Sequence, residues 1–564
     1  MSRDTVNPSA ITGSAASAAT ASAATASAAT AFALRDPIAE GLARGWAVTD
    51  GRRLDQPLQM EADVVIIGSG AGGGIAADVL SRAGLSVILV EEGPLRSSRD
   101  FRMLESEAYP DLYQESAARK TADKAINILQ GRAVGGSTTV NWTSSFRTPP
   151  ATLSHWARHH GLQDFTPQDL APWFDRVEQA LGIAPWGIPP NPNNEALRRG
   201  GQRLGIPVEV IRRNVRGCWN LGYCGVGCPT NAKQSMLVTT IPAALDRGAT
   251  LLHSVRAQRL VRQGDRITEL QARPMDGAGL QPREVSIRLR ARHFIVAGGA
   301  INSPALLMRS ELPDESGLLG QRTFLHPTVI GSALMAEPVR GDAGAPQSLY
   351  SDHFLDTAPI EGTEIGFKLE SAPLHPVLFA TTLQGFGATH QALMQRFSHA
   401  QVLLALLRDG FQPDSPGGQV RLRRDGTPEL HYPLGDAIWR AVRRALLTMA
   451  QIQLEAGAVE VTSVHEQASM WRTWEQARRG IEALDLRPLL TRVVSAHVMG
   501  GCAMGSDPRR SVTDARGRLH AIANLTVADG SLFPTSIGAN PQESIYGIVL
   551  RQITELAQQL KPRA

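Results

Sequence analysis

The feature that most constrains this chain is the segment 62–93, which reads ADVVIIGSGAGGGIAADVLSRAGLSVILVEEG. Its apolar run at 62–67 has the length of a buried parallel strand, and a glycine-rich turn follows directly. A helical stretch then extends to about residue 83, and a second apolar strand ends at Glu91. A G-x-G-x-x-G turn between a strand and a helix, with an acid after the next strand, is typical of a dinucleotide-binding βαβ unit.

Each residue type in this unit has a physical reason. Gly68 allows the tight turn, Gly70 lets a pyrophosphate approach the backbone, and Gly73 lets the helix pack closely on the strand. The helix N-terminus offers free N–H groups and a partial positive charge to phosphates. Glu91 is placed to accept hydrogen bonds from a ribose 2′-hydroxyl and to repel a 2′-phosphate. We therefore expect an ADP-containing cofactor other than NADP.

The bulk properties limit the class of protein. A chain of 564 residues exceeds one ordinary hydrophobic core, so two or more domains are expected. Lys and Arg number 57 against 53 Asp and Glu, and no dense basic block occurs, which argues against nucleic acid as the main partner. No strongly apolar run reaches the ~18 residues of a membrane span. Peripheral membrane contact stays open.

The composition of the amino-terminal region does not predict a folded domain. Segment 14–34 consists almost entirely of Ala, Ser and Thr in an ASAAT-like repeat, and it lacks the basic start and Leu-rich centre of a secretion signal. We expect residues 1–45 to form a flexible tail. With four cysteines in the whole chain, the expected location is the cytoplasm, where disulfides are rare.

A second glycine-rich segment lies at 131–141, and further segments in which a short strand is followed by a glycine turn occur at 292–308 and 525–530, far apart in the sequence. The region 321–490 differs, with a hairpin expected at 418–432 and an amphipathic helix at 436–456. This pattern predicts an α/β protein with a Rossmann-like domain built from discontinuous segments, and an inserted α+β domain that contains an antiparallel sheet. The expected boundaries are 60–150, 215–320 and 490–564 for the cofactor domain, and 151–214 and 321–489 for the substrate-binding domain.

Six segments, taken in order, resemble the glucose–methanol–choline (GMC) oxidoreductases, a family that binds FAD. They are VEEGP at 90–94, GRAVGGSTTVN at 131–141, GGAINSPALL at 298–307, LHPTVIG at 325–331, AHVMGGCAMG at 496–505 and VADGSLFPTSIGANPQESI at 527–545. Within the family, the segment 217–242 is most similar to bacterial long-chain alcohol oxidases and related dehydrogenases.

The resemblance implies oxidation of an alcohol (a CH–OH donor) to an aldehyde or ketone by hydride transfer to the flavin. By resemblance, His497 is the base that takes the hydroxyl proton, a task that suits an imidazole. Asn540 orients the hydroxyl, at a position where many relatives carry a second histidine. We expect a hydrophobic or long-chain alcohol, and oxygen, a quinone or a cytochrome as the electron acceptor. A flavin-dependent lyase or decarboxylase on the same scaffold is the first alternative.

The cofactor contacts follow from the same resemblance. Besides the four residues of the ADP-binding unit, the implied contacts are Arg132, Gly136 and Asn141 beneath the flavin ring, Val255 at the adenine, and Asp529 and Gly530 near the ribityl chain and pyrophosphate. Some relatives attach FAD through a histidine in the first signature. Residues 137–140 are Ser, Thr, Thr and Val, so non-covalent FAD is expected.

Three cysteines lie close together in a glycine-rich loop, at Cys218, Cys224 and Cys228. The spacing resembles that of certain membrane-linked sugar dehydrogenases of the family, which carry an iron–sulfur cluster, and such an enzyme is the second alternative. The adjacent AKQS segment instead resembles the alcohol-oxidase branch, for which these cysteines are inert loop residues. A fourth nearby ligand for structural zinc is missing, and no metal site is expected.

Overall fold

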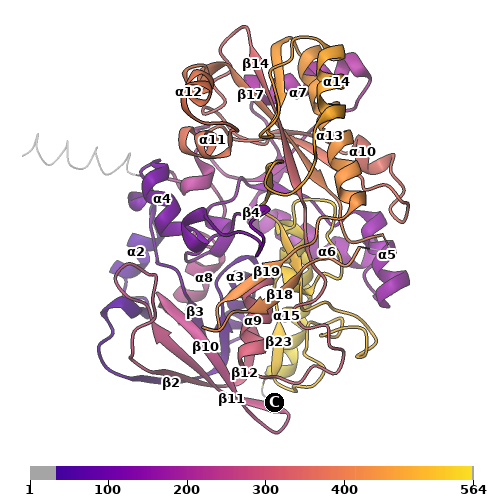
Figure 1. Ribbon diagram of the computed structural model, residues 1–564. Helices are drawn as coiled ribbons and strands as arrows, with labels where there is room; N and C mark the ends of the chain where they lie inside the picture. The colour runs from indigo at the N-terminus through magenta and orange to yellow at the C-terminus, as the bar shows by residue number, and fades with distance from the viewer. Residues whose placement is uncertain (1–33, 413–414, 562–564) are drawn as a thin grey trace, which may run out of the picture.

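The computed structural model describes residues 34–412 and 415–561. Two large sheets, each of eight strands in these residues, lie one above the other in Figure 1. The first runs through β1 (Val48–Asp50), β9 (Thr250–His253), β3 (Val87–Glu91), β2 (Leu58–Ile67), β12 (Ile287–Val296), β11 (Arg266–Pro274) and β10 (Val255–Gln263), with β23 (Leu525–Val527) also paired to β12. The second runs through β4 (Ile126–Ile128), β21 (Val493–Ser495), β14 (Thr328–Met335), β17 (Ala400–Leu407), β16 (Phe367–Ser371), β15 (Leu349–Ser351) and β7 (Glu209–Val210), with β20 (Ala458–Ser463) paired to β14.

The remaining strands form small sheets. These are β13 (Thr323–Leu325) with β22 (Val498–Gly500), β18 (Gln419–Leu422) with β19 (Pro428–His431), and β5 (Ser144–Ser145), β8 (Arg212–Asn214) and β6 (Ile183–Pro185). The helices are α2 (Pro37–Ala43), α3 (Ala71–Arg82), α4 (Glu105–Leu112), α5 (Pro150–His160), α6 (Pro167–Leu181), α7 (Pro192–Leu204), α8 (Thr240–Asp246), α9 (Gly299–Arg309), α10 (His353–Asp356), α11 (Pro376–Thr382), α12 (Gly387–Gln395), α13 (Asp436–Glu455), α14 (Trp474–Ala483) and α15 (Gln542–Leu560).

The first sheet is parallel where it holds the glycine-rich turn. Strands β1, β9, β3, β2, β12 and β23 pair in parallel, while β10 and β11 form an antiparallel extension. Alternate residues of β2 enter two different cores, with Val65 and Ile67 on one face and Val64 and Ile66 on the other. The second core also contains side chains from α3, α8 and α15. A continuous apolar run of this kind is what a strand covered on both faces requires, and it confirms the expected α/β class.

The second sheet is mainly antiparallel, and its strands alternate between two cores. On β17, Leu403, Ala405 and Leu407 pack in the core that includes α13, whereas Val402, Leu404 and Leu406 face α11. The twofold period of a strand explains this division, because successive side chains point to opposite faces. The expected antiparallel sheet is therefore present, and β17 presents a row of apolar side chains toward α11.

Several local expectations can be compared with the structure. The expected hairpin is β18–β19, and the expected helix at 436–456 is α13. The tail expected at 1–45 does not reach residue 45, because α2 forms at 37–43 with the Asp36 carboxylate capping its N–H groups and Ile38 buried. Residues 1–33 lie outside the described part of the chain. The domain boundaries stay a prediction; β4 and β21, from segments expected in the cofactor domain, pair within the second sheet.

Among the helices that the structure describes, none combines the length and the apolar character that crossing a membrane would need.

Candidate active site

A cavity of about 710 Å³ opens beyond the carboxyl ends of β2, β3, β12 and β23. In open α/β sheets this edge is where ligands bind. The lining brings together segments that are hundreds of residues apart in the sequence. The predicted site residues in it are Gly68, Gly70, Glu91, Gly136, Asn141, Val255, His497, Asp529, Gly530 and Asn540.

Glycine residues, which expose their backbone to the cavity, form the end where we expect the dinucleotide. Gly68 has φ +100°, and a Cβ there would lie 2.3 Å from the carbonyl oxygen of Ala297. Gly70 and Gly136 face one another so closely that a Cβ on Gly136 would lie 2.6 Å from the Gly70 Cα. Helix α3 begins at Ala71 and directs its free N–H groups to this point. These features fit a pyrophosphate, which needs close backbone approach and N–H donors.

Glu91 ends β3 at the rim of this cradle. Its carboxylate accepts hydrogen bonds from the Ser69 N–H at 3.0 Å, the Ser69 hydroxyl at 2.6 Å and the Gly93 N–H at 2.9 Å. Burial raises the pKa of Glu91, and these three hydrogen bonds oppose that shift. The carboxylate is therefore held rigidly at the place where the sequence predicts a ribose.

Asp529 ties two of the distant segments together. Its side chain accepts hydrogen bonds from the Gly299 N–H at 2.8 Å, the Ser303 hydroxyl at 2.5 Å and the Ser531 N–H at 2.8 Å. The turn before α9 and the end of β23 are thereby held side by side. Asn141 is fixed in the same way, because its Nδ2 donates to Gln542 Oε1 at 2.6 Å.

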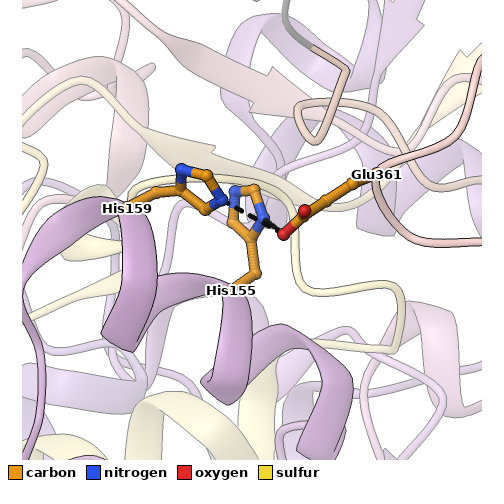
Figure 2. Close-up of side chains that lie close together, drawn as sticks. All are labelled: His155, His159 and Glu361. Atoms are coloured by element: carbon orange, nitrogen blue, oxygen red, sulfur yellow. Dashed lines mark hydrogen bonds and ion pairs between the residues drawn. The ribbon is translucent and has the colours of Figure 1, made fainter.

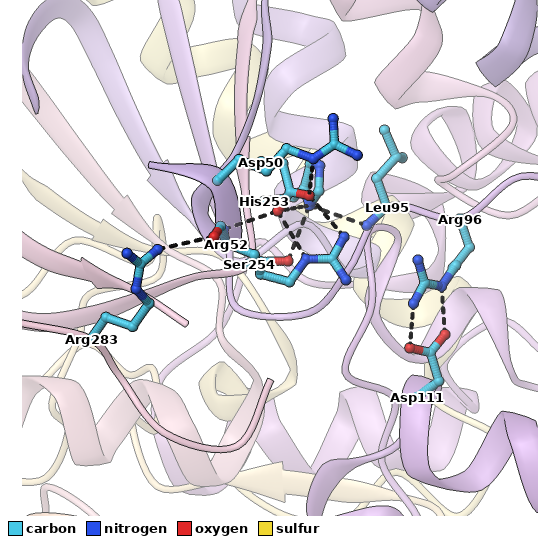
Figure 3. Close-up of polar contacts among 9 residues, drawn as sticks. Asp50, Arg52, Leu95, Arg96, Asp111, His253, Ser254 and Arg283 are labelled. Atoms are coloured by element: carbon cyan, nitrogen blue, oxygen red, sulfur yellow. Dashed lines mark hydrogen bonds and ion pairs between the residues drawn. The ribbon is translucent and has the colours of Figure 1, made fainter. Parts of the chain in front are cut away.

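Val255 lines the cavity at the start of β10, directly after a kink in the backbone. Ser254 has φ +55°, and this kink separates β9 from β10. The His253 ring lies behind it and accepts a hydrogen bond from the Leu95 N–H at 3.4 Å. Figure 3 shows the polar contacts that support this corner, among them those of Asp50, Arg52, His253 and Ser254.

Two predicted contacts do not line the cavity. Gly73 lies one turn into α3, where a Cβ would come within 1.8 Å of the Gly68 carbonyl oxygen, so its role is the close helix–strand packing that the motif predicts. The Arg132 side chain donates to the carbonyl oxygen of Gly279, and its positive charge lowers the pKa of Glu92. The backbone of Gly131 takes the place at the cavity that we expected for Arg132.

His497 lies between β21 and β22 and is half-buried, with its exposed part facing the cavity. The Ser495 hydroxyl donates to the His497 carbonyl oxygen at 3.0 Å and accepts from its N–H at 3.3 Å, which fixes the loop. Burial, together with the positive charge of Lys368, lowers the pKa of His497 to about 4. The imidazole is therefore neutral at neutral pH, as a proton acceptor must be.

Asn540 lines the same cavity, and the oxygen of its side-chain amide has no hydrogen-bond partner among the described residues. Its Nδ2 donates to Glu370 Oε2 at 3.4 Å, whereas its Oδ1 is buried. Buried polar atoms are normally paired, so this oxygen fits a ligand that brings a donor such as a hydroxyl. Burial raises the pKa of Glu370 to about 7, although Lys368 and the amides of Asn540 and Gln347 oppose the shift.

Sequence reasoning missed Glu370 and His326. His326 lies behind His497, with the two Nδ1 atoms 3.0 Å apart. The LHPTVIG segment that contains His326 carries part of the resemblance to the family, but the sequence predicts no role for this histidine. Glu370 carries no local signal, because an isolated acid in a short strand resembles any other polar residue.

A second, smaller cavity of about 100 Å³ adjoins the first, and the residues that line both are Leu129, Trp142, Gln347, Ala496 and His497. Its walls include the apolar row of β17 and one face of α11. The apolar side chains include Ile330, Leu378, Phe379, Leu383, Val402, Leu404 and Leu406.

The three loop cysteines have separate partners. Cys218 Sγ accepts from the Asn220 N–H at 3.4 Å, Cys224 Sγ accepts from Arg213 at 3.7 Å, and Cys228 Sγ lies 3.5 Å from the Thr230 hydroxyl. In the described residues, they do not form a group whose sulfur atoms could share one metal ion.

The group that does have metal-like spacing in the described chain is His155, His159 and Glu361 (Figure 2). Both imidazoles approach the same oxygen of Glu361, at 3.0 and 3.1 Å. The Arg158 guanidinium donates to that oxygen at 2.6 Å. Because this cation already neutralises the carboxylate and repels a divalent ion, the cluster is an Arg–Glu–His network at the surface.

Comparison with known proteins decides the family. Residues 109–328 and 413–548 match the two family models described as GMC oxidoreductase, and residues 63–102 match an FAD binding domain. The "Uncharacterized GMC-type oxidoreductase y4nJ" of Sinorhizobium fredii is 30% identical over 89% of this chain and 95% of its own length. The chain is a GMC oxidoreductase.

Other GMC relatives differ in substrate. The "Long-chain-alcohol oxidase FAO4A" of Arabidopsis thaliana is 28% identical over 91% of this chain and 72% of its own length. The "6'''-hydroxyparomomycin C oxidase" of Streptomyces lividus is 29% identical over 88% of this chain and 92% of its own. Among solved structures, pyridoxine 4-oxidase from Mesorbium loti has a TM-score of 0.64 at 20% identity, covering 88% of this chain and 98% of that one.

These findings confirm the resemblance and the fold. The protein is an FAD-dependent oxidoreductase that acts on CH–OH groups.

Proposed function

We propose that this GMC oxidoreductase oxidises a hydrophobic alcohol to an aldehyde or ketone, using non-covalently bound FAD and His497 as the proton acceptor. The observation that carries the proposal is that His497 lies where the two cavities meet and lines both the large cavity and the apolar one. When bound, FAD accepts the hydride that leaves the alcohol carbon. An alcohol whose chain lies in the apolar cavity brings its hydroxyl to His497.

Residues of the chain itself take up the proton, orient the substrate and exclude water. The neutral His497 ring takes the hydroxyl proton, a step that general-base catalysis accelerates by ~10²–10⁴-fold. Before that transfer, the free Oδ1 of Asn540 accepts the hydrogen bond from the same hydroxyl proton and so orients the bound alcohol, while Glu370 accepts a hydrogen bond from the amide Nδ2 of Asn540. The apolar walls exclude water, so the alcohol binds by burying its chain.

The apolar lining supports an aliphatic substrate over a sugar-like one. Of the two curated relatives named for their substrates, one takes a long-chain alcohol and the other a paromomycin derivative. A polyhydroxylated substrate needs several polar partners, whereas the side chains between β17 and α11 are almost all aliphatic or aromatic. A panel of alcohols of increasing chain length, assayed with oxygen and with an artificial acceptor, identifies both the substrate and the electron acceptor.

Substitutions at Leu404 are expected to change chain-length preference. Leu404→Phe narrows the apolar cavity and should lower kcat/KM for long alcohols by about 10–200-fold relative to short ones, since one methylene in a tight pocket has an effect of that order. Leu403→Phe on the opposite face of β17 is the matched control, because Leu403 packs toward α13. Equal chain-length profiles in the two variants would show that the substrate lies elsewhere.

FAD is expected to dissociate when the protein unfolds. Among the described residues that line the large cavity, cysteine is absent, the sole histidine is the candidate base His497, and the Tyr113 hydroxyl donates to the Gly225 carbonyl oxygen at 2.5 Å. Acid precipitation should therefore release the yellow colour into the supernatant. Colour that stays in the pellet would indicate a covalent bond.

The two alternatives are separated by simple observations. In a lyase or decarboxylase, the flavin colour would stay unchanged when an alcohol is added without oxygen. In an alcohol oxidoreductase, the alcohol reduces the flavin and the yellow colour is lost. An iron–sulfur sugar dehydrogenase would contain iron, and the separate partners of Cys218, Cys224 and Cys228 disfavour it. Iron at background level in the purified protein would remove that alternative.

A further inference from the structure

His326 lies between the His497 ring and the backbone of the segment that carries Asn540. Its Nδ1 lies 3.0 Å from Nδ1 of His497, and the ring planes meet at 88°. On its other side, His326 Nε2 accepts a hydrogen bond from the backbone N–H of Gly538 at 3.2 Å. Gly538 belongs to the buried segment that also carries Asn540. His326 itself is 1% exposed, so protein groups surround it.

Both imidazoles are neutral at neutral pH. Burial lowers the pKa of His326 well below its usual value, and the neighbouring His497, Lys368 and Arg408 act in the same direction. Burial and Lys368 also lower the pKa of His497. Each ring therefore carries one N–H and one unprotonated nitrogen.

The Gly538 N–H decides where these two protons lie. If His497 Nδ1 were the donor to His326 Nδ1, the proton of His326 would have to be on Nε2, where it would face a second N–H. If His326 Nδ1 is the donor, both of its contacts are hydrogen bonds. A backbone N–H cannot become an acceptor, so only the second arrangement pairs every group.

We infer that His326 is a positioning residue that sets the tautomer of His497, and that the resting His497 therefore presents Nε2–H to the cavity. The inference takes its catalytic meaning from the proposed function of His497. An arriving alcohol first meets a hydrogen-bond donor, which aligns its oxygen beside the imidazole. Proton uptake at Nε2 then requires the two rings to exchange tautomers.

The exchange conserves protons. The exchanged pair holds the same two protons, one on Nδ1 of His497 and the other on Nε2 of His326, where it would face the Gly538 N–H. The exchanged pair loses the buried hydrogen bond from Gly538, so it is about tenfold to hundredfold rarer than the resting pair. The Gly538 N–H thus biases the candidate base toward its donor form.

The tautomer can be measured directly by ¹⁵N NMR of the holoenzyme labelled at histidine, with His497→Gln used to assign the His497 signals. We expect a protonated Nε2 and an unprotonated Nδ1 at neutral pH. A protonated Nδ1 in the wild-type spectrum would overturn the inference. The measurement needs no alcohol, so it is independent of whether alcohols bleach the flavin, which tests the proposed function.

A pair of variants tests whether His326 is the cause. His326→Phe keeps a planar ring but removes both hydrogen bonds, and His497 should then show both tautomers. His293→Phe removes another buried histidine, on β12, and should leave the His497 signals unchanged. If His497 keeps only its Nε2 proton in His326→Phe, His326 has no positioning role. If that variant does not fold, the wild-type spectrum still decides the tautomer.

Discussion

Replacing His497 with alanine is expected to leave FAD bound and to slow alcohol-driven bleaching of the flavin by a factor of ~10² or more. The His497 side chain faces the junction of the two cavities, whereas the pyrophosphate cradle is made by glycines at the far end of the larger one. Removing the imidazole therefore removes the proton acceptor and leaves the dinucleotide contacts intact. Anaerobic stopped-flow absorbance measures the rate.

The control for this variant is His159→Ala, which removes a half-exposed surface histidine. It should bleach at the wild-type rate. The pH profile gives a second check: because the pKa of His497 is lowered to about 4, protonation of His497 should slow the wild-type enzyme only as the pH drops toward 4, whereas a change in rate near pH 7 belongs to Glu370, whose pKa is raised to about 7. A near-normal rate in His497→Ala would remove this residue from the mechanism.

Gly136→Ala is expected to weaken FAD binding by about 10–100-fold, since overpacking of a close contact costs ~1–3 kcal/mol. The new Cβ would lie 2.6 Å from the Gly70 Cα, and backbone on both sides leaves it no room to move. Opening this contact would displace the turn that we expect to hold the pyrophosphate. Titration of the apoprotein with FAD, followed by absorbance, measures the change.

The matched control is Gly84→Ala, in the turn between α3 and β3. Gly84 has φ +83° and Gly136 has φ +54°, so both substitutions place alanine in a left-handed conformation. A Cβ on Gly84 meets nothing within 4 Å, so this variant carries the conformational cost without the clash. Equal FAD affinities in the two variants would show that close approach of the two glycine turns is not needed for binding.

Local patterns in the chain were sufficient for the strand, turn and helix that we expect to hold the ADP part of the cofactor. The strand, turn and helix around Gly68, and the acid at Glu91, are neighbours in sequence, and their conformations follow from short-range sterics and periodicity. Arg132 shows the limit of this reasoning, because the motif places its backbone near the cavity but leaves its side-chain direction to the Gly279 loop.

The substrate half depended on contacts that no local pattern encodes. His326, His497 and Gly538 lie on three separate segments, and only the packing of the two sheets brings an imidazole between a backbone N–H and a second imidazole. Glu370 reaches Asn540 in the same way, across the second sheet. Sequence periodicity predicts which face of a helix or strand is buried. The protonation state and the hydrogen-bond partners of a side chain depend instead on the groups packed against that face. Those groups come from distant parts of the chain, so only the tertiary structure determines them.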